Sequence, residues 1–466
     1  MKVYKNLMLI AVSVFWCSAA CDQTQPVWES NTADYTYQPI GANAANLFLY
    51  YPEVSENSNQ LIEHLSKSGI SILRFPGGTT ANFYHPKEPG YGFRSSDLDV
   101  LKTSPVKQHM EKTMMAEAGI IRKNGLETNF IYPLSKLVAK HEIPVMYVAN
   151  LLTGTVEETL FAIKELEANE VTIFGVELGN EYYLKAYADK FPSVDAYLSK
   201  AKTFAAAIKQ QFPDIQLSVV GAPSSEIKPL SSREKNWNSA LSKATFYKAI
   251  SVHCYPYGER KSAKDIAPCG SIEALEMGHR QLSAALKDYD RQFGTKDIWI
   301  SEWNILGAPK WCSNSWSHAC FTTAALASFS GHKSVKCHIY HSLLSRGEGY
   351  NLIKKGQTDE LSATFNAHAF QLNKLLQNHL GKESGSLTQE IQQLENGAVD
   401  ITYTLKDGKR MAQIVLNPTS SALETPRHQS QLQNVYLITE DGFSIKSISG
   451  STQLAPKCIA LFLYSK

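Results

Sequence analysis

The stretch GVELGNEYYL, residues 175–184, decides the fold and poses the functional question. It ends an apolar run, Val171 to Leu178, that a single glutamate interrupts, and it leads into Gly179-Asn180-Glu181. The run WISEWN, residues 299–304, has the same form and carries Glu302 near its end. Polar groups therefore stand where apolar strands stop, which is where parallel α/β folds place their functional side chains.

Eight apolar runs of this kind recur along the chain, separated by segments with helical periodicity. In residues 197–212, YLSKAKTFAAAIKQQF, apolar residues recur at helical spacing until Pro213 ends the helix. Eight strands alternating with helix-length segments favour an α/β fold, a parallel sheet closed into a (β/α)8 TIM barrel. An open doubly wound sheet is the alternative, although no GxGxxG follows the first strand. The expected strands are Gly41–Leu49, Ile70–Phe75, Val145–Asn150, Val171–Leu178, Leu217–Ala222, Ile250–Cys254, Ile298–Glu302 and Val335–Tyr340.

The chain changes character after about residue 381. Apolar and polar residues alternate around Asp407-Gly408 and again around Asp441-Gly442, and both dipeptides are hairpin turn signals. We therefore expect the barrel over residues 39–381 and a small antiparallel β-sandwich domain over residues 382–466. A strand from near residues 27–39 could complete that C-terminal domain.

The N-terminus has the layout of an export signal. In residues 1–20, Lys2 and Lys5 precede an apolar stretch too short to span a membrane, followed by small residues. The ending Ser18-Ala19-Ala20-Cys21 resembles a bacterial lipobox, in which the cysteine is lipidated and becomes the first residue. We expect residues 21–38 to form a tether. The protein is then an exported lipoprotein anchored through Cys21 at the outer membrane or cell surface, with the periplasm or plain secretion as alternatives.

Composition excludes some functions. Lys and Arg number 46 against 44 for Asp and Glu, and this net charge of +2 gives no broad footprint for nucleic acid. The chain has no CxxC pair and no clustered histidines, so we expect no metal site and no cofactor. Six cysteines follow the N-terminal segment, and an exported protein can oxidise them. Two close pairs are plausible disulfides, Cys254 with Cys269 and Cys312 with Cys320. We expect the other two cysteines, Cys337 and Cys458, to be buried thiols.

Glu181 and Glu302 lie at the ends of two different strands, the fourth and the seventh. In a closed barrel this places them across the mouth from each other. Two carboxylates facing one cavity suit the cleavage of a glycosidic bond, because one can protonate the leaving oxygen while the other attacks the anomeric carbon. The sequence thus predicts a glycoside hydrolase with a carbohydrate substrate.

The segments LRFPGG, GVELGNE, SVHCYPY and WISEWN resemble clan A of the glycoside hydrolases, the retaining (β/α)8 enzymes, over most of residues 41–375. RFPGG and SEWN lean toward the arabinofuranosidase, xylosidase and heparanase-like branches. The resemblance implies that Glu181 is the acid/base and Glu302 the nucleophile, and that Arg74, Asn180, His253 and Tyr255 bind substrate or support the nucleophile. Two further residues are expected to bind substrate: Asn150, at the end of the third predicted strand, and Trp303, whose ring could stack on a sugar face.

Strand eight departs from the clan pattern. VKCHIYHSLL lacks the tryptophan common there, and Tyr340 or His341 could replace it. Two other functions stay open: a non-catalytic glycan-binding lipoprotein on a barrel scaffold, and a barrel enzyme of another class such as a metal hydrolase. Each site residue alone also has a structural interpretation, since Asn180-Glu181 could start a helix and Trp303 could be packing.

Overall fold

The computed structural model describes most of the chain from residue 33 to residue 465. The segments outside the description are residues 1–32, 35–36, 45–46, 48–50, 52–53, 89–91, 103–104, 112–128, 257–273, 276, 306–313, 346–350, 357–359, 382–386, 395–396, 406–409, 425–430, 440–441, 447–452 and 466. The predicted signal segment and Cys21 lie outside the described residues and stay predictions. Among the helices of the described part, none is long and apolar enough to cross a membrane.

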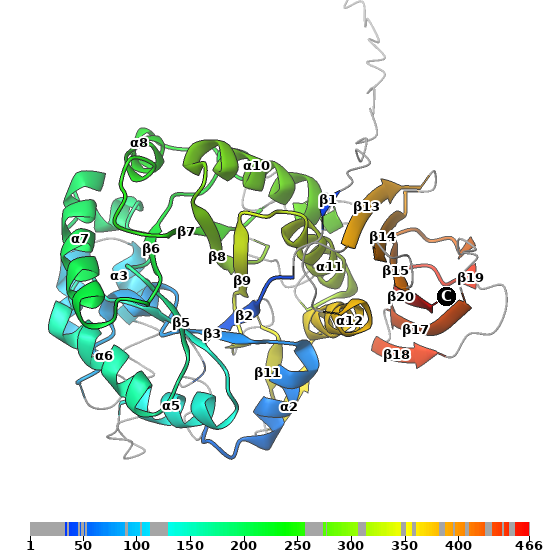
Figure 1. Ribbon diagram of the computed structural model, residues 1–466, viewed down its shortest axis with the longest axis horizontal. Helices are drawn as coiled ribbons and strands as arrows, with labels where there is room; N and C mark the ends of the chain where they lie inside the picture. Colours follow the sequence, from blue (N-terminus) through cyan, green and yellow to red (C-terminus); the bar gives the residue numbers. More distant parts are fainter. Residues whose placement is uncertain are drawn as a thin grey trace, which may run out of the picture.

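Eight parallel strands close into a barrel in chain order, with helices around it (Figure 1). This confirms the (β/α)8 TIM barrel and excludes the open sheet. The strands are β2 (Ile40–Asn43), β3 (Ile72–Phe75), β4 (Val145–Val148), β5 (Ile173–Glu177), β6 (Leu217–Val220), β7 (Ala249–Cys254), β8 (Asp297–Trp303) and β9 (Val335–Tyr340).

The predicted strand bounds agree closely except at the first strand. The predicted run continued to Leu49, whereas β2 ends at Asn43. Apolarity continues past the strand because Leu47, which follows it, is itself fully buried. Burial of a residue beyond the strand therefore extended the apolar pattern past the last hydrogen-bonded pair.

Helices alternate with the strands, and their sequences explain their ends. In α7 (Val194–Gln211), the N-cap Ser193 accepts a hydrogen bond from the amide of Ala196. In α6 (Val156–Ala168), Thr155 and Glu158 form a reciprocal capping box. The other long helices are α2 (Asn59–Ser68), α5 (Ile131–Lys140), α8 (Ser232–Leu241), α10 (Leu282–Phe293), α11 (Trp316–Ser330) and α12 (Phe365–Leu380). A small sheet of β10 (Leu344–Ser345), β11 (Ile353–Lys355) and β12 (Leu361–Ala363) follows the barrel.

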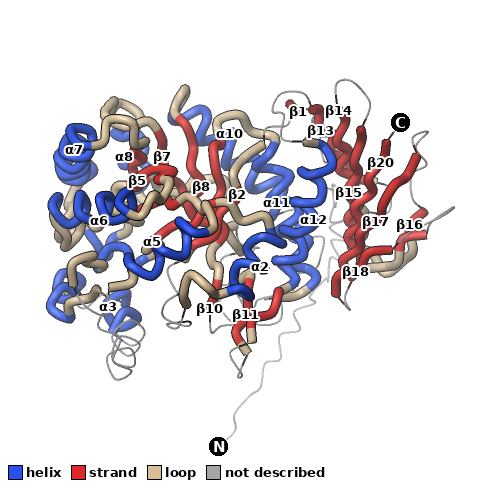
Figure 2. Tube along the Cα trace, turned by 60° about the horizontal axis from the view of Figure 1, so that its bottom comes forward, coloured by secondary structure: helices blue, strands red, loops and turns tan. Residues whose placement is uncertain are grey.

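The C-terminal part is antiparallel, as predicted. Seven strands pair in the order β1-β13-β14-β15-β20-β17-β18, and the strand contributed by the N-terminal segment is β1. One face of this sheet shares an apolar cluster with α11 and α12, and the other shares one with the β16-β19 pair. Figure 2 shows the sheet standing beside α11 and α12. The strands are β1 (Ala33–Asp34), β13 (Leu387–Gln393), β14 (Val399–Leu405), β15 (Arg410–Asn417), β16 (Leu423–Glu424), β17 (Gln431–Thr439), β18 (Gly442–Lys446), β19 (Gln453–Leu454) and β20 (Cys458–Ser465).

The cysteines are buried where they are described. Cys337 and Cys458 are buried, as expected. Cys254 is a buried free thiol, which does not support the expected bridge to Cys269, a residue outside the described part. Cys312 also lies outside it, so its bridge to the buried Cys320 stays a prediction.

Candidate active site

The turn after β5 presents Glu181 to the mouth of the barrel. Gly179 has a φ of 106°, and a Cβ there would lie 2.0 Å from the Tyr182 ring, so only glycine fits. Glu181 itself has a φ of 53°, in the left-handed region that non-glycine residues rarely adopt. Asn82 Nδ2 donates to the carbonyl oxygen of Asn180 at 2.9 Å and supports the turn from the neighbouring loop.

Glu302 lies almost buried at the end of β8, with 7% of its side chain exposed. Its Oε1 accepts hydrogen bonds from Arg74 Nη1 at 2.7 Å and from Asn43 Nδ2 at 3.2 Å. Its Oε2 accepts one from the Tyr255 hydroxyl at 2.7 Å. Three donors from β2, β3 and the end of β7 therefore converge on this carboxylate and favour its ionised form.

The electrostatic environment holds the pKa of Glu302 well below its usual range. Burial alone would raise that pKa, but the positive charges of His253 and Arg74 and the hydrogen bond from Tyr255 outweigh it. His341 Nδ1 lies 3.7 Å from Oε2. Burial lowers the pKa of His341, so we attribute the stabilisation of the carboxylate to His253 and Arg74 rather than to a charged His341.

His253 joins the two glutamates. Its Nδ1 lies 2.9 Å from Glu181 Oε1 and 3.5 Å from Glu302 Oε2. Burial disfavours the imidazolium, but the two carboxylates outweigh burial and raise the pKa of His253. Glu181 Oε1 also accepts from the Tyr183 hydroxyl at 2.9 Å. With 23% of its side chain exposed, Glu181 is the more accessible of the two carboxylates.

The guanidinium of Arg74 is fully buried and bonds on three sides. Its Nε donates to Glu177 Oε2 at 2.7 Å, its Nη1 to Glu302, and its Nη2 to Asn180 Oδ1 at 2.9 Å. Ser301 Oγ donates to the other oxygen of Glu177 at 2.9 Å. A continuous polar layer thus crosses the barrel beneath the two predicted catalytic carboxylates.

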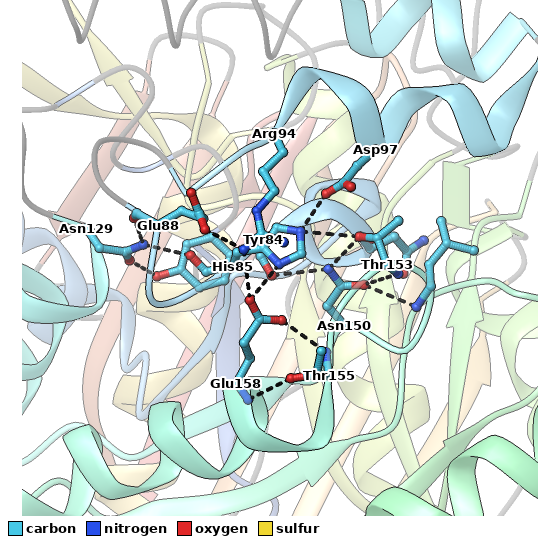
Figure 3. Close-up of polar contacts among 12 residues, drawn as sticks. Tyr84, His85, Glu88, Arg94, Asp97, Asn129, Asn150, Thr153, Thr155 and Glu158 are labelled. Carbon is cyan, nitrogen blue, oxygen red and sulfur yellow. Dashed lines mark hydrogen bonds and ion pairs between the residues drawn. The ribbon is translucent and has the colours of Figure 1, made fainter.

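Asn150 lies beside this layer and holds a loop. Its Nδ2 donates to the carbonyl of Tyr84 at 3.2 Å and to Thr153 Oγ1 at 2.9 Å, while its Oδ1 accepts from the amides of Leu152 and Thr153 (Figure 3). Its described bonds therefore fix the turn after β4 and do not reach Glu181 or Glu302.

A second ionic cluster surrounds His85 in the same loop region. The ring of His85 lies between two carboxylates, with Nδ1 3.0 Å from Glu158 and Nε2 2.6 Å from Asp97 (Figure 3). Arg94 Nη2 lies 3.4 Å from Glu158. Burial would lower the pKa of His85, but the hydrogen bonds and charges of Asp97 and Glu158 raise it to about 9. The cluster ties the loop after β3 to the start of α6.

Trp303 does not face the mouth of the barrel. Its side chain has no exposed surface and packs against Phe321, Phe329 and Phe370 of α11 and α12. The predicted sugar-stacking role therefore has no support from its position. Tyr340 also packs on Phe370, so the residue after β9 that lies near Glu302 is His341.

Sequence reasoning brought together Arg74, Asn180, Glu181, His253, Tyr255 and Glu302, and the structure places all six in one hydrogen-bonded cluster. It missed Asn43, Glu177 and Tyr183. The sequence could have indicated Glu177, because it is the single charged residue inside an otherwise apolar strand. Among the described residues, no group of three or more His, Cys, Asp and Glu could hold a metal ion.

No protein-family profile matches the chain, and no curated protein sequence matches it either. Solved structures do resemble it. A family 51 α-L-arabinofuranosidase from Bifidobacterium longum is 13% identical with a TM-score of 0.65, covering 94% of this chain and 98% of its own. A 4-O-α-L-rhamnosyl-β-D-glucuronidase from Fusarium oxysporum is also 13% identical with a TM-score of 0.59, covering 94% and 99%. A family 44 xyloglucanase from Paenibacillus polymyxa is 10% identical with a TM-score of 0.56, covering 94% and 98%. At these identities the likeness establishes the fold of glycoside hydrolases and nothing finer.

Proposed function

We propose that the protein is a retaining glycoside hydrolase that cleaves O-glycosidic bonds of oligo- or polysaccharides. The observation that carries the proposal is the pairing of Glu181 and Glu302 through His253 at the mouth of the barrel. Distances of 2.9 Å and 3.5 Å from His253 Nδ1 limit the separation of the two carboxylate oxygens to their sum, about 6.4 Å. Retaining enzymes hold the two groups about 5 to 5.5 Å apart, a separation that this limit allows.

Glu302 is the nucleophile in this proposal. Its environment keeps it ionised, and it attacks the anomeric carbon as the bond to the leaving oxygen breaks. Glu181, the more exposed carboxyl, protonates that oxygen. It then removes a proton from the water that attacks the same carbon and releases Glu302. Because Glu181 and His253 lie 2.9 Å apart, the histidine can pass a proton to Glu181 for the first step.

Asn180 binds the substrate in this proposal. Arg74 only donates hydrogen bonds, so Asn180 must direct its Oδ1 at Arg74 and keep its NH2 group for another acceptor. A hydroxyl next to the reacting carbon is that acceptor. Asn82, which holds the carbonyl of Asn180, positions the amide.

Purified protein incubated with plant, algal and animal glycans tests the proposal. We expect released sugars, and NMR of the first product should show the anomeric configuration of the substrate. An inverted product contradicts the retaining mechanism. Binding without any product, over a panel that includes arabinan, xylan and glucuronides, would instead favour the non-catalytic glycan-binding alternative.

Variants assign the two roles. Glu302→Ala should abolish turnover of every substrate, because no covalent intermediate can form. Glu181→Ala should retain activity on substrates with an activated leaving group, and azide should raise its rate and give a glycosyl azide of unchanged configuration. Glu167→Ala, an exposed glutamate on α6, is the matched control and should behave as the wild type. Equal loss on both substrate types without azide rescue would refute the assignment of Glu181.

We also propose export of the protein and its anchoring through a lipid on Cys21. The support is the sequence alone: an apolar N-terminal segment that ends in Ser18-Ala19-Ala20-Cys21. A Cys21→Ala protein should move from the membrane fraction to the soluble fraction of the native host. Continued fractionation with membranes would contradict the anchor.

A further inference from the structure

Glu177 is a third carboxylate inside the barrel, and the proposed reaction does not use it. Its side chain has no exposed surface. Both of its oxygens are engaged, one with Arg74 Nε at 2.7 Å and the other with Ser301 Oγ at 2.9 Å. Ser301 immediately precedes Glu302, so Glu177 contacts the nucleophile strand and the nucleophile's cation at once.

The surroundings make this charge influential. The layer of side chains deeper in the barrel is apolar, and charge interactions next to such a layer are screened less than in water. Burying a carboxylate is costly unless a cation and hydrogen bonds satisfy it, and Glu177 has both. The deeper layer consists of Ile72, Met146, Ala249, Trp299, Cys337 and Ile339.

Arg74 is therefore shared between two carboxylates. Its Nε faces Glu177 and its Nη1 faces Glu302, both at 2.7 Å. A cation that paired with Glu302 alone would stabilise the carboxylate strongly and lower its tendency to form a bond to carbon. A second carboxylate at the same distance from Arg74 reduces the stabilisation that Arg74 gives to Glu302.

We infer that Glu177 is a positioning residue that fixes the orientation of Arg74 and divides its charge between two carboxylates, so that Glu302 is held in place yet remains a competent nucleophile. The inference rests on the proposed function for its effect on rate. The sharing of the charge of Arg74 concerns only the described side chains, and it can be measured without any substrate.

Glu177→Gln removes the charge and keeps the shape: its oxygen can accept from Arg74, and its NH2 group can donate to Ser301 Oγ, which reverses that hydrogen bond. The charge of Arg74, now opposed by Glu302 alone, then acts more strongly on His253, whose pKa it lowers. NMR titration of the His253 ring, assigned by its absence in a His253→Gln protein, should show a lower pKa than in the wild type. Glu158→Gln, a buried glutamate in the His85 cluster, is the matched control and should leave the His253 titration unchanged.

Kinetics test the effect on the nucleophile. In Glu177→Gln, the glycosylation step on a substrate with an activated leaving group should slow on the order of tenfold or more. Glu177→Asp keeps the charge but shortens the side chain. It should slow the same step with little change in the His253 titration, and it provides the test if the glutamine variant fails to fold.

The outcomes are separable. An unchanged His253 titration in a folded Glu177→Gln protein would overturn the sharing of charge. Wild-type glycosylation rates in both Glu177 variants would overturn the positioning role while leaving the glycosidase proposal intact. A wild-type protein that cleaves no glycan would refute the proposed function, and the titration would still decide whether Glu177 shares Arg74.

Discussion

The ionic cluster around His85 gives a quantitative prediction about stability. Its ring has no exposed surface and lies between Asp97 and Glu158, which raise its pKa from 6.5 to about 9. At about 1.4 kcal/mol for each pH unit, this difference corresponds to about 3 kcal/mol of folding free energy. Because the pKa is raised in the folded protein, the contribution is complete below about pH 6.5 and is lost as the pH rises through about 9.

The change that tests this is His85→Gln, which removes the charge and keeps a hydrogen-bonding side chain. Urea unfolding followed by tryptophan fluorescence should be measured at pH 6 and at pH 10 for both proteins. The wild type should lose about 3 kcal/mol more than the variant over this interval. His141→Gln is the control, because the ring of His141 bonds to the backbone carbonyl of Glu56 rather than to a carboxylate.

The result that would refute the reasoning is a difference between wild type and His85→Gln that does not change with pH. The ring would then act through packing and neutral hydrogen bonds alone. A pH-dependent difference would also predict a functional consequence, since the same loop carries Asn82, which supports the turn before Glu181. Activity of the wild type should then fall as the pH rises through about 9, whereas the variant should start lower at neutral pH and lack this alkaline step.

Three other predictions concern Trp303, Tyr255 and the pair Cys312 and Cys320. Trp303→Ala should lower the free energy of unfolding by about 3 to 5 kcal/mol because it opens a cavity against α11 and α12, and thermal denaturation that finds no loss would contradict the packing role. Tyr255→Phe removes a 2.7 Å hydrogen bond to Glu302 and should lower kcat/KM on the order of tenfold to a hundredfold, whereas unchanged kinetics would remove Tyr255 from the site. Cys312 and Cys320 should appear as one cross-linked peptide in non-reducing mass mapping, and two free thiols would rule the bridge out.

The site residues at the ends of the barrel strands could be predicted from the sequence. Glu181 and Glu302 each close an apolar run, and position at a strand end is a local property of the sequence. Arg74 and His253 could be added because a resemblance supplied their roles, and the structure brings both within hydrogen-bond distance of a carboxylate that we propose to be catalytic. Spacing alone could not have shown that His253 contacts both glutamates.

The errors in the predicted site have physical causes. Asn43 was hidden inside a predicted strand that continued to Leu49, so it did not stand at a strand end. Trp303 was expected at the site because its ring could stack on a sugar face, but the pairing of β8 with β9 shifts register between Ile300 and Trp303. Such a shift breaks the alternation of inward and outward side chains, and it depends on neighbouring strands rather than on the local sequence.

The two glutamates lie in different environments, which supports the different roles proposed for them. Glu302 receives hydrogen bonds from Arg74, Asn43 and Tyr255 and is nearly buried, so its environment is built for a permanent negative charge. Glu181 stands higher on a left-handed turn, more exposed, and shares a short contact with a histidine that can hold a proton. The turn Gly179-Asn180-Glu181 therefore places two side chains differently. Asn180 points toward Arg74, and Glu181 lies toward the mouth of the barrel, where we propose that the leaving oxygen binds. In the proposed mechanism, a carboxylate at this point of the chain can exchange a proton with the substrate, whereas one buried in the layer below could not.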